Sequence, residues 1–195
     1  MSDPIFIVLT GGPGGGKTTL INELAGDLVW AGCFIALPEA ISLMGGVGLS
    51  PREKRFQSEM VRVQMAQEDN LSCELGSENQ GMILCNRGSL DPLAYWLDCG
   101  WPEDEFLECT GTTREEHYRR YAIIIHLVTA ADGAEQAYRR WPENPRPEMP
   151  ETAIRIDRLL QQVWSGHPNY FRIGNQGRDW AAKSGEARRI LERFL

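Results

Sequence analysis

The chain has 195 residues, the length of one domain, and its 42% hydrophobic share is ordinary for a soluble globular protein. Its formal net charge of −7 argues against a broad electrostatic interaction with nucleic acid, although arginine-rich segments could still bind anions locally. No apolar run approaches the roughly 20 residues that span a bilayer, and the N-terminus lacks the charged region of a signal peptide, so we expect a cytoplasmic protein.

The N-terminal half of the chain alternates apolar runs with helical patterns. Residues 5–9 and 33–37 predict two short strands, the second closed by Pro38. Between them, residues 18–28 predict a helix with Leu20, Ile21, Leu24 and Leu28 near one face. A glycine-rich loop at residues 44–51 precedes a second helix over about residues 52–71.

The C-terminal half continues the alternation. We expect a helix from Asp91, which caps it, and irregular structure over residues 98–116 apart from a short helix at 103–108. A proline-rich stretch over residues 141–150 cannot hold regular structure. The other predicted elements are strands at 81–85, 122–128 and 170–173, and helices at 133–140, 152–164 and about 181–194.

A glycine-rich stretch directly follows the first strand. Its sequence, Gly-Gly-Pro-Gly-Gly-Gly-Lys-Thr, fits the phosphate-binding pattern G-x-x-x-x-G-K-[ST] at every required position. Glycines let backbone N–H groups approach an anion closely, and the helix start adds its positive dipole end. We expect Lys17 to reach the β- and γ-phosphates and the Thr18 hydroxyl to ligate Mg²⁺. The predicted nucleotide-binding residues are Gly11, Gly12, Pro13, Gly14, Gly15, Gly16, Lys17, Thr18 and Thr19.

These observations predict a single α/β domain over residues 1–195. Strands that alternate with helices form a parallel sheet with right-handed crossovers. The expected fold is a three-layer P-loop NTPase, with about five parallel strands, helices on both faces and an arginine-bearing lid at about residues 139–151.

Several further motifs follow the phosphate loop in order. They are Pro38-Glu39-Ala40, Asn86-Arg87-Gly88 with Asp91 and Tyr95, Asn144-Pro145-Arg146-Pro147-Glu148, and His167-Pro168 with Asn175. With the loop, they resemble the NadR-type AAA domain family, which contains the ribosylnicotinamide kinase domain of NadR and the TRPL-translocation-defect ATP/GTP-binding proteins. The resemblance covers nearly the whole chain, and the family is similar in layout to nucleoside and nucleotide kinases.

The chain departs from the family pattern at Asn86, where members usually carry an aspartate that would hold Mg²⁺ or its water shell. Asn86 offers a neutral carbonyl, a weaker ligand for a hard cation. Either Asp91 or Glu39 supplies the missing charge, or Thr18, phosphates and water mainly hold the metal.

Two charged residues at strand ends are candidates for catalysis, because ligands of open α/β sheets bind at that edge. Glu39 is interpreted as the base for a substrate hydroxyl or as a carboxylate near the metal, with a solvated loop glutamate as the alternative. Arg87 is predicted to bind substrate or phosphate through its guanidinium, with a structural ion pair as the alternative.

Further candidates lie in the second half of the chain. Arg139, Arg140 and Arg146 would neutralise charge on the transferred phosphoryl group, or else form a solvated basic face. Asn175 follows the fifth strand, where related kinases hold adenine, or else lies in a plain turn. Three glutamines of the second helix, Gln57, Gln64 and Gln67, are candidates for binding a nucleoside base, but we interpret them by default as solvated. His126 lies within an apolar strand and is interpreted as a core histidine with its hydrogen bonds satisfied.

The sequence therefore predicts an Mg²⁺-dependent kinase that transfers the γ-phosphate of ATP to a hydroxyl of a nucleoside-like or other small acceptor. The alternative is a nucleotide-dependent regulatory or switch protein with slow NTP hydrolysis, which Asn86 favours. A nucleic-acid motor is disfavoured by the acidic balance and by the lack of a second core domain.

Overall fold

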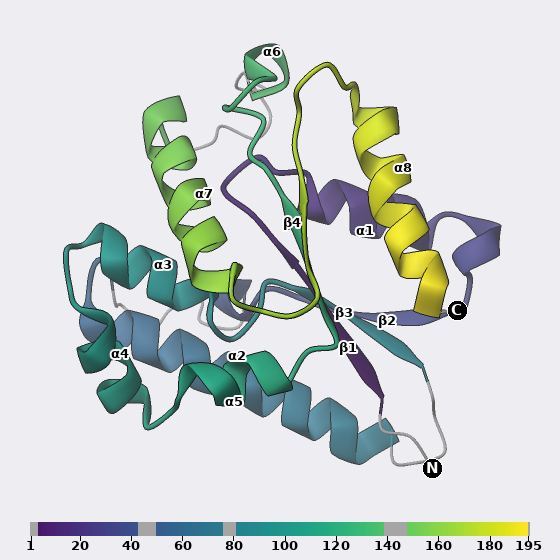
Figure 1. Cartoon of the computed structure of the whole chain (residues 1–195). Coiled ribbons are helices and arrows are strands. Elements are labelled where there is room, and N and C mark those ends of the chain that lie inside the picture. Colours follow the sequence, from purple (N-terminus) through teal and green to yellow (C-terminus); the bar gives the residue numbers. More distant parts are fainter. Residues whose placement is uncertain (1–3, 43–49, 76–80, 139–147, 195) are drawn as a thin grey trace.

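The fold is taken from a computed structural model that describes residues 4–42, 50–75, 81–138 and 148–194 (Figure 1). Five strands form one sheet in the order β2-β3-β1-β4-β5, and every neighbouring pair is parallel. This confirms the predicted fold class. The strands are β1 (Ile5–Thr10), β2 (Phe34–Leu37), β3 (Met82–Asn86), β4 (Ile123–Leu127) and β5 (Tyr170–Ile173).

Both faces of the sheet are buried against helices. Successive side chains of a strand point to opposite faces, so Ile7 and Leu9 belong to one apolar cluster and Val8 to the other. The central strands are predominantly apolar for this reason, with His126 as a buried polar residue within β4. The large cluster around Val8 includes the fully buried rings of Trp96 and Trp164.

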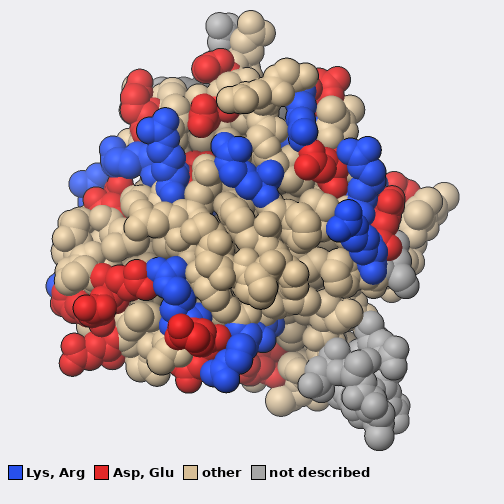
Figure 2. Space-filling view, viewed as in Figure 1, with Lys and Arg blue, Asp and Glu red and all other residues tan. Residues whose placement is uncertain are grey.

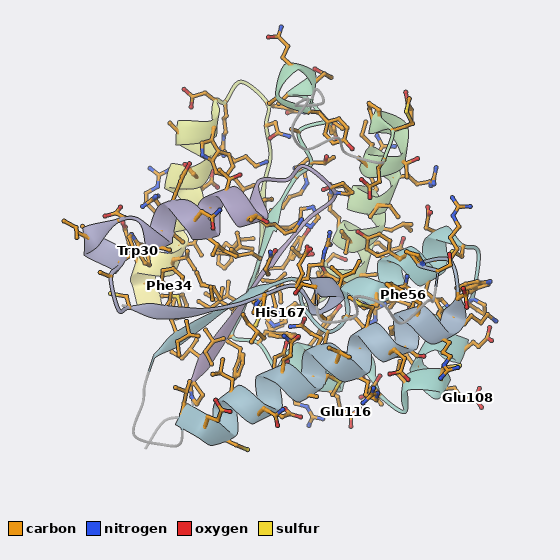
Figure 3. The ribbon with its side chains drawn as sticks, turned by 180° about the vertical axis from the view of Figure 1, so that it is seen from behind. Trp30, Phe34, Phe56, Glu108, Glu116 and His167 are labelled. Atoms are coloured by element: carbon orange, nitrogen blue, oxygen red, sulfur yellow. The ribbon has the colours of Figure 1, made fainter. Side chains whose placement is uncertain are left out.

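Helices cover the two faces unequally (Figure 1). Helices α1 (Lys17–Ala25) and α8 (Trp180–Leu191) cover one face, where Trp30 and Phe34, labelled in Figure 3, join the same cluster. The opposite face carries α2 (Lys54–Leu75), α3 (Asp91–Asp98), α4 (Glu103–Thr110), α5 (Arg114–Arg119) and α7 (Pro150–Trp164). The short elements are η1 (Leu28–Trp30), η2 (Ala40–Ser42), α6 (Glu135–Tyr138) and η4 (Glu192–Phe194).

The first helix is shorter than predicted. It ends at Ala25, and Leu28 lies in η1 with 91% of its surface exposed, so Leu28 does not belong to the buried face. The Asp27 carboxylate accepts a hydrogen bond from the Val29 N–H at 3.0 Å and caps this separate turn. A glycine followed by an aspartate therefore stops the helix before the apolar pattern ends.

Within residues 98–116, the short helix predicted at 103–108 is confirmed as α4, but α5 begins at Arg114, where irregular structure was predicted. Gly111 ends α4 in the left-handed conformation, with φ at 65°. Thr113 then begins α5 through a capping box, in which its hydroxyl accepts from the Glu116 N–H and Glu116 accepts from the Thr113 N–H. The pattern T-x-x-E was readable in the sequence, and its omission made the prediction wrong.

The helices and the cysteines bear on two general properties of the chain. No helix in the described ranges is long and apolar enough to cross a membrane. All five cysteines are free thiols, which agrees with their odd number and with the absence of a C-x-x-C pair.

Replacing Thr113 with alanine should lower the free energy of unfolding by about 1 kcal/mol, because the Glu116 N–H loses its acceptor. Urea denaturation measures the difference. Thr113→Ser keeps the hydroxyl oxygen and should stay within a few tenths of a kcal/mol of the parent. Equal losses in the two variants would contradict a capping role.

Candidate nucleotide and acceptor site

The phosphate loop, residues 11–18, connects β1 to α1, and hydrogen bonds hold its carbonyl oxygens. Every carbonyl from residue 11 to residue 15 accepts at least one bond from a side chain or from another loop. With the donor first, the pairs are Lys17 with Gly11 (2.8 Å) and Gly12 (3.3 Å), the Thr129 hydroxyl with Pro13, the Ala130 N–H with Gly14 (3.2 Å), and Lys183 with Gly15 (3.0 Å).

Several backbone N–H groups of the same loop, in contrast, have no hydrogen-bond partner in the described structure. No hydrogen-bond acceptor within the described ranges serves the N–H groups of Gly14, Gly16, Lys17 and Thr18. Gly16 holds φ at 96°, and a Cβ atom there would lie 2.4 Å from the Trp180 ring, so only glycine fits. Paired carbonyls and unpaired amides make the concave donor surface that binds phosphate.

Lys17 adds a cation to this surface. Its side chain is buried and folds back so that Nζ lies 2.8 Å from the Gly11 carbonyl oxygen. Burial, together with the nearby Arg87 charge, lowers the pKa of Lys17 to about 7, while Glu39 and Asp91 oppose the shift. An anion in the loop would favour the charged form of Lys17 and raise its pKa again.

Asp157 of α7 holds the start of the loop. Its Oδ1 accepts hydrogen bonds from the Gly12 N–H at 2.7 Å and from the Thr129 N–H at 2.9 Å. Its Oδ2 accepts from Gln161 at 2.7 Å and lies 3.2 Å from His126 Nε2. Burial alone would raise the pKa of Asp157, but the interactions with His126, Gly12 and Gln161 lower it to about 2. A charged carboxylate under the loop therefore fixes its backbone.

His126 is buried, as predicted, but it is not satisfied. Its ring lies close to the Asp157 carboxylate but is not aligned for a hydrogen bond, and neither ring nitrogen has a hydrogen-bond partner in the described structure.

Asn175 and Lys183 connect the loop to the C-terminal part of the chain. Asn175 Nδ2 donates to the carbonyl oxygens of Thr129 and Asp132 at 2.8 Å, and its Oδ1 accepts from Lys183 Nζ at 2.9 Å. The Asn175 side chain thus has a structural role, and Asn175 and Gln176 line a hollow of about 250 Å³. This hollow is where the sequence predicts adenine, and that placement stays a prediction.

Thr18, in the first turn of α1, lies beside Asn86, the last residue of β3. Thr18 is exposed, and its Oγ1 is 3.5 Å from Asn86 Nδ2. Asn86 Oδ1 is buried without a hydrogen-bond partner among the described residues. A hydroxyl beside a free amide oxygen fits Mg²⁺, which takes oxygen ligands, provided that phosphates supply the negative charge.

Glu39, Arg87 and Asp91 form one cluster. Arg87 Nε donates to Glu39 Oε1 at 2.7 Å, and Nη1 lies 3.3 Å from Asp91 Oδ2. Burial would lower the pKa of Arg87, but Tyr95, Glu39 and Asp91 raise it above its ordinary value. The Arg87 backbone has φ at 86°, a strained conformation for a non-glycine residue and one that often marks functional sites.

Asp91 is the most constrained member of this cluster, with 1% of its surface exposed. Its oxygens accept from the Thr10 hydroxyl at 2.9 Å and from Trp164 Nε1 at 2.7 Å. Direct metal ligation by Asp91, as the sequence predicts, would require these bonds to rearrange. In the described arrangement Asp91 orients Arg87.

A second cavity, of about 240 Å³, opens beside this cluster. Its walls combine apolar side chains of α2 with the charged cluster, and Phe56, labelled in Figure 3, stands near the start of that helix. Gln57 and Gln64 line it and are each 3% exposed, so the prediction that they are solvated was wrong. Helical spacing places both on the inner face of α2.

The remaining predicted site residues are Thr19 and the three lid arginines. Thr19 is exposed on the first turn of α1. Arg139, Arg140 and Arg146 lie outside the described residues, as does most of the predicted lid, so their roles stay predictions. On the face in Figure 2, basic and acidic side chains are interspersed around a broad uncharged centre.

A parallel sheet of this strand order, with a glycine loop between β1 and α1, defines a P-loop nucleotide-binding protein with a kinase-like fold. The AAA domain family model matches residues 6–181, and the chain belongs to that family. A crystal structure of NadR in complex with NR has a similar fold, with a TM-score of 0.67 and 17% sequence identity. That match covers 98% of this chain but 51% of NadR, so the chain spans about half of its length. A search of curated proteins gave no match.

Replacing Asp157 with alanine should weaken ATP binding at least about tenfold and lower the free energy of unfolding by about 3 kcal/mol, because the Gly12 and Thr129 N–H groups lose their acceptor. Calorimetry and urea denaturation measure the two effects. Asp157→Asn keeps one accepting oxygen, so its ATP affinity and its free energy of unfolding should lie between those of the parent and of Asp157→Ala. Normal ATP affinity in a folded Asp157→Ala protein would show that the loop does not need this anchor.

When ATP binds near pH 8, the protein should take up a proton at Lys17. Lys17 loses its proton near pH 7 in the free protein, and bound phosphates favour its charged form. Affinity should therefore fall by up to about tenfold per pH unit above pH 7 and level off below it. Calorimetry in buffers of different ionisation enthalpy measures the uptake.

Lys17→Arg is the matched control, because a guanidinium keeps its charge throughout this range. Its ATP affinity should not depend on pH between 7 and 9. Proton uptake that persists in this variant would point instead to Lys183, whose pKa burial lowers to about 8.

Proposed function

We propose that the protein is an ATP- and Mg²⁺-dependent kinase that phosphorylates a hydroxyl of a small, nucleoside-like acceptor. The observation that carries this proposal is the position of the Glu39–Arg87–Asp91 cluster between the phosphate loop and the second cavity. Arg87, Glu39 and Asp91 lie close enough to Lys17 for their charges to shift its pKa. Glu39 and Arg87 also line the cavity.

In the proposed reaction, the acceptor hydroxyl oxygen attacks the γ-phosphorus and the bond from that phosphorus to the β–γ bridging oxygen breaks. The electrons of the broken bond leave with ADP, and the hydroxyl proton passes to Glu39. The Oε1 of Glu39 pairs with Arg87, and Oε2 has no hydrogen-bond partner in the described ranges, which suits a proton acceptor. Lys17 and the loop amides stabilise the negative charge of the phosphates.

Thr18 and Asn86 are the residues that would hold Mg²⁺. The bound ion would neutralise charge on the phosphates of ATP. Because Asn86 carries no charge, the ion would depend more on phosphate oxygens than it would beside an aspartate.

The charges around the second cavity favour an acceptor without phosphate. Its described lining contains three carboxylates, from Glu39, Asp91 and Glu148, and one guanidinium, from Arg87. That guanidinium already interacts with two of the carboxylates. A phosphorylated acceptor would meet net negative charge there, whereas a neutral or cationic nucleoside would not.

The alternative function is a nucleotide-dependent switch with slow hydrolysis. Asn86 supports it, because a neutral amide at the metal-side position weakens catalysis more than it weakens binding. This alternative predicts ATP binding and slow phosphate release without transfer to any acceptor.

The kinase proposal is tested by measuring ADP formation with ATP, Mg²⁺ and a panel of nucleosides. At saturating ATP, Glu39→Gln should lower turnover by roughly 10²–10⁴-fold, the usual contribution of a general base. Glu59→Gln removes a carboxylate that pairs with Arg62 on the surface of α2, and it should have normal turnover. ATP binding with no transfer to any nucleoside would overturn the kinase proposal in favour of the switch.

A further inference from the structure

The acceptor cavity contains two glutamine side chains whose positions suggest a selective role. Gln57 and Gln64 lie seven residues apart on α2, which is about two turns, so both face the same side of the helix. Both are buried, and both line the cavity with the apolar side chains of Phe56 and Met60. Polar groups that are few, buried and set among apolar walls commonly fix which ligand a cavity accepts.

The orientation of the Gln57 carboxamide is determined by its partner. Its Nε2 donates a hydrogen bond to the carbonyl oxygen of Pro51 at 2.6 Å. A backbone carbonyl only accepts hydrogen bonds, so the nitrogen of Gln57 must face Pro51. The Oε1 atom has no protein partner in the described ranges and remains available to the cavity that Gln57 lines.

A buried network orients Gln64 in the same sense. Its Nε2 donates to Glu68 Oε1 at 2.8 Å, and Glu68 Oε2 accepts from Arg120 Nε at 2.8 Å. Tyr121 accepts the Ser89 N–H at 2.6 Å and donates its own proton to Glu68 Oε1 at 2.7 Å. Glu68 is therefore surrounded by donors, so the nitrogen of Gln64 faces it and Gln64 Oε1 is left for the cavity.

We propose that Gln57 and Gln64 present two carbonyl oxygens to the acceptor and so select nucleosides whose ring system carries N–H donors, such as an amino or carboxamide group. This inference rests on the proposed kinase function and identifies the class of acceptor. A ligand that offers only acceptor atoms to these oxygens leaves them unpaired in a desolvated cavity, which is how sites built around a hydrogen bond reject analogues.

The test uses three pairs of nucleosides that differ in one amino group: adenosine and purine riboside, cytidine and pyrimidin-2-one riboside, and ribosylnicotinamide and its acetylpyridine counterpart. In the wild-type protein, the member with the N–H₂ group should have a kcat/KM at least about tenfold higher in the pair that is phosphorylated. This comparison needs no variant, so a folding defect cannot obscure it.

Variants then assign the preference to the two glutamines. Gln57→Met and Gln64→Met keep the length of the side chain and remove the carboxamide, and the preference should fall below about threefold in at least one of them. Gln67→Met is the matched control, because Gln67 lies on the same helix but does not line the cavity. It should retain the full preference.

The outcomes separate the two proposals. Phosphorylation without a preference for the amino-bearing member, or a preference that persists in both cavity variants, would overturn the role of the glutamines and leave the kinase proposal intact. Binding of ATP without transfer to any member of the panel would overturn the kinase proposal and this inference with it.

Discussion

The direction of the peptide groups in the phosphate loop is the constraint on which the rest of the site depends. Each carbonyl from Gly11 to Gly15 is bonded from within the loop, from the turn after β4 or from α8. Turned this way, the amides of Gly14, Gly16, Lys17 and Thr18 have no acceptor in the described structure and can serve an anion. The burial of Lys17, the anchor at Asp157 and the close contact of Trp180 with Gly16 all follow from the need to hold one backbone conformation.

A second set of contacts extends this rigidity to the second cavity. Thr10, the last residue of β1, donates to Asp91, which in turn orients Arg87. Arg87 holds Glu39, and its own backbone N–H bonds to Leu9 at 3.1 Å. The residues that would bind phosphate and those that would handle the acceptor are therefore mechanically connected through the end of β1. Pre-organisation of this kind lowers the cost of bringing two reactants together.

The sequence predicted the parts of this arrangement that depend on local order. The strand, glycine loop and helix form a contiguous motif, and Glu39 and Arg87 follow neighbouring strands, so their meeting at one edge of the sheet was expected. Asp157 and Lys183 were missed because they reach the loop from 145 and 168 residues away. The sequence did contain a signal for Asp157, because this residue shares the inner face of α7 with Ala153 and Leu160, and a carboxylate is unusual on a buried helix face. The burial of Gln57 and Gln64 was not predicted, because the buried face of each helix was assigned from its apolar residues alone.

The contact between Lys183 and Gly15 has a consequence for how the protein is made. Gly15 precedes Lys183 by 168 residues, so the last donor to the loop carbonyls, which lies on α8, is synthesised long after the loop itself. Until α8 has been synthesised and has docked, the loop has an incomplete set of bonds. Nucleotide can therefore help to drive the final docking step of α8, because a ligand that binds only the finished site stabilises it by mass action.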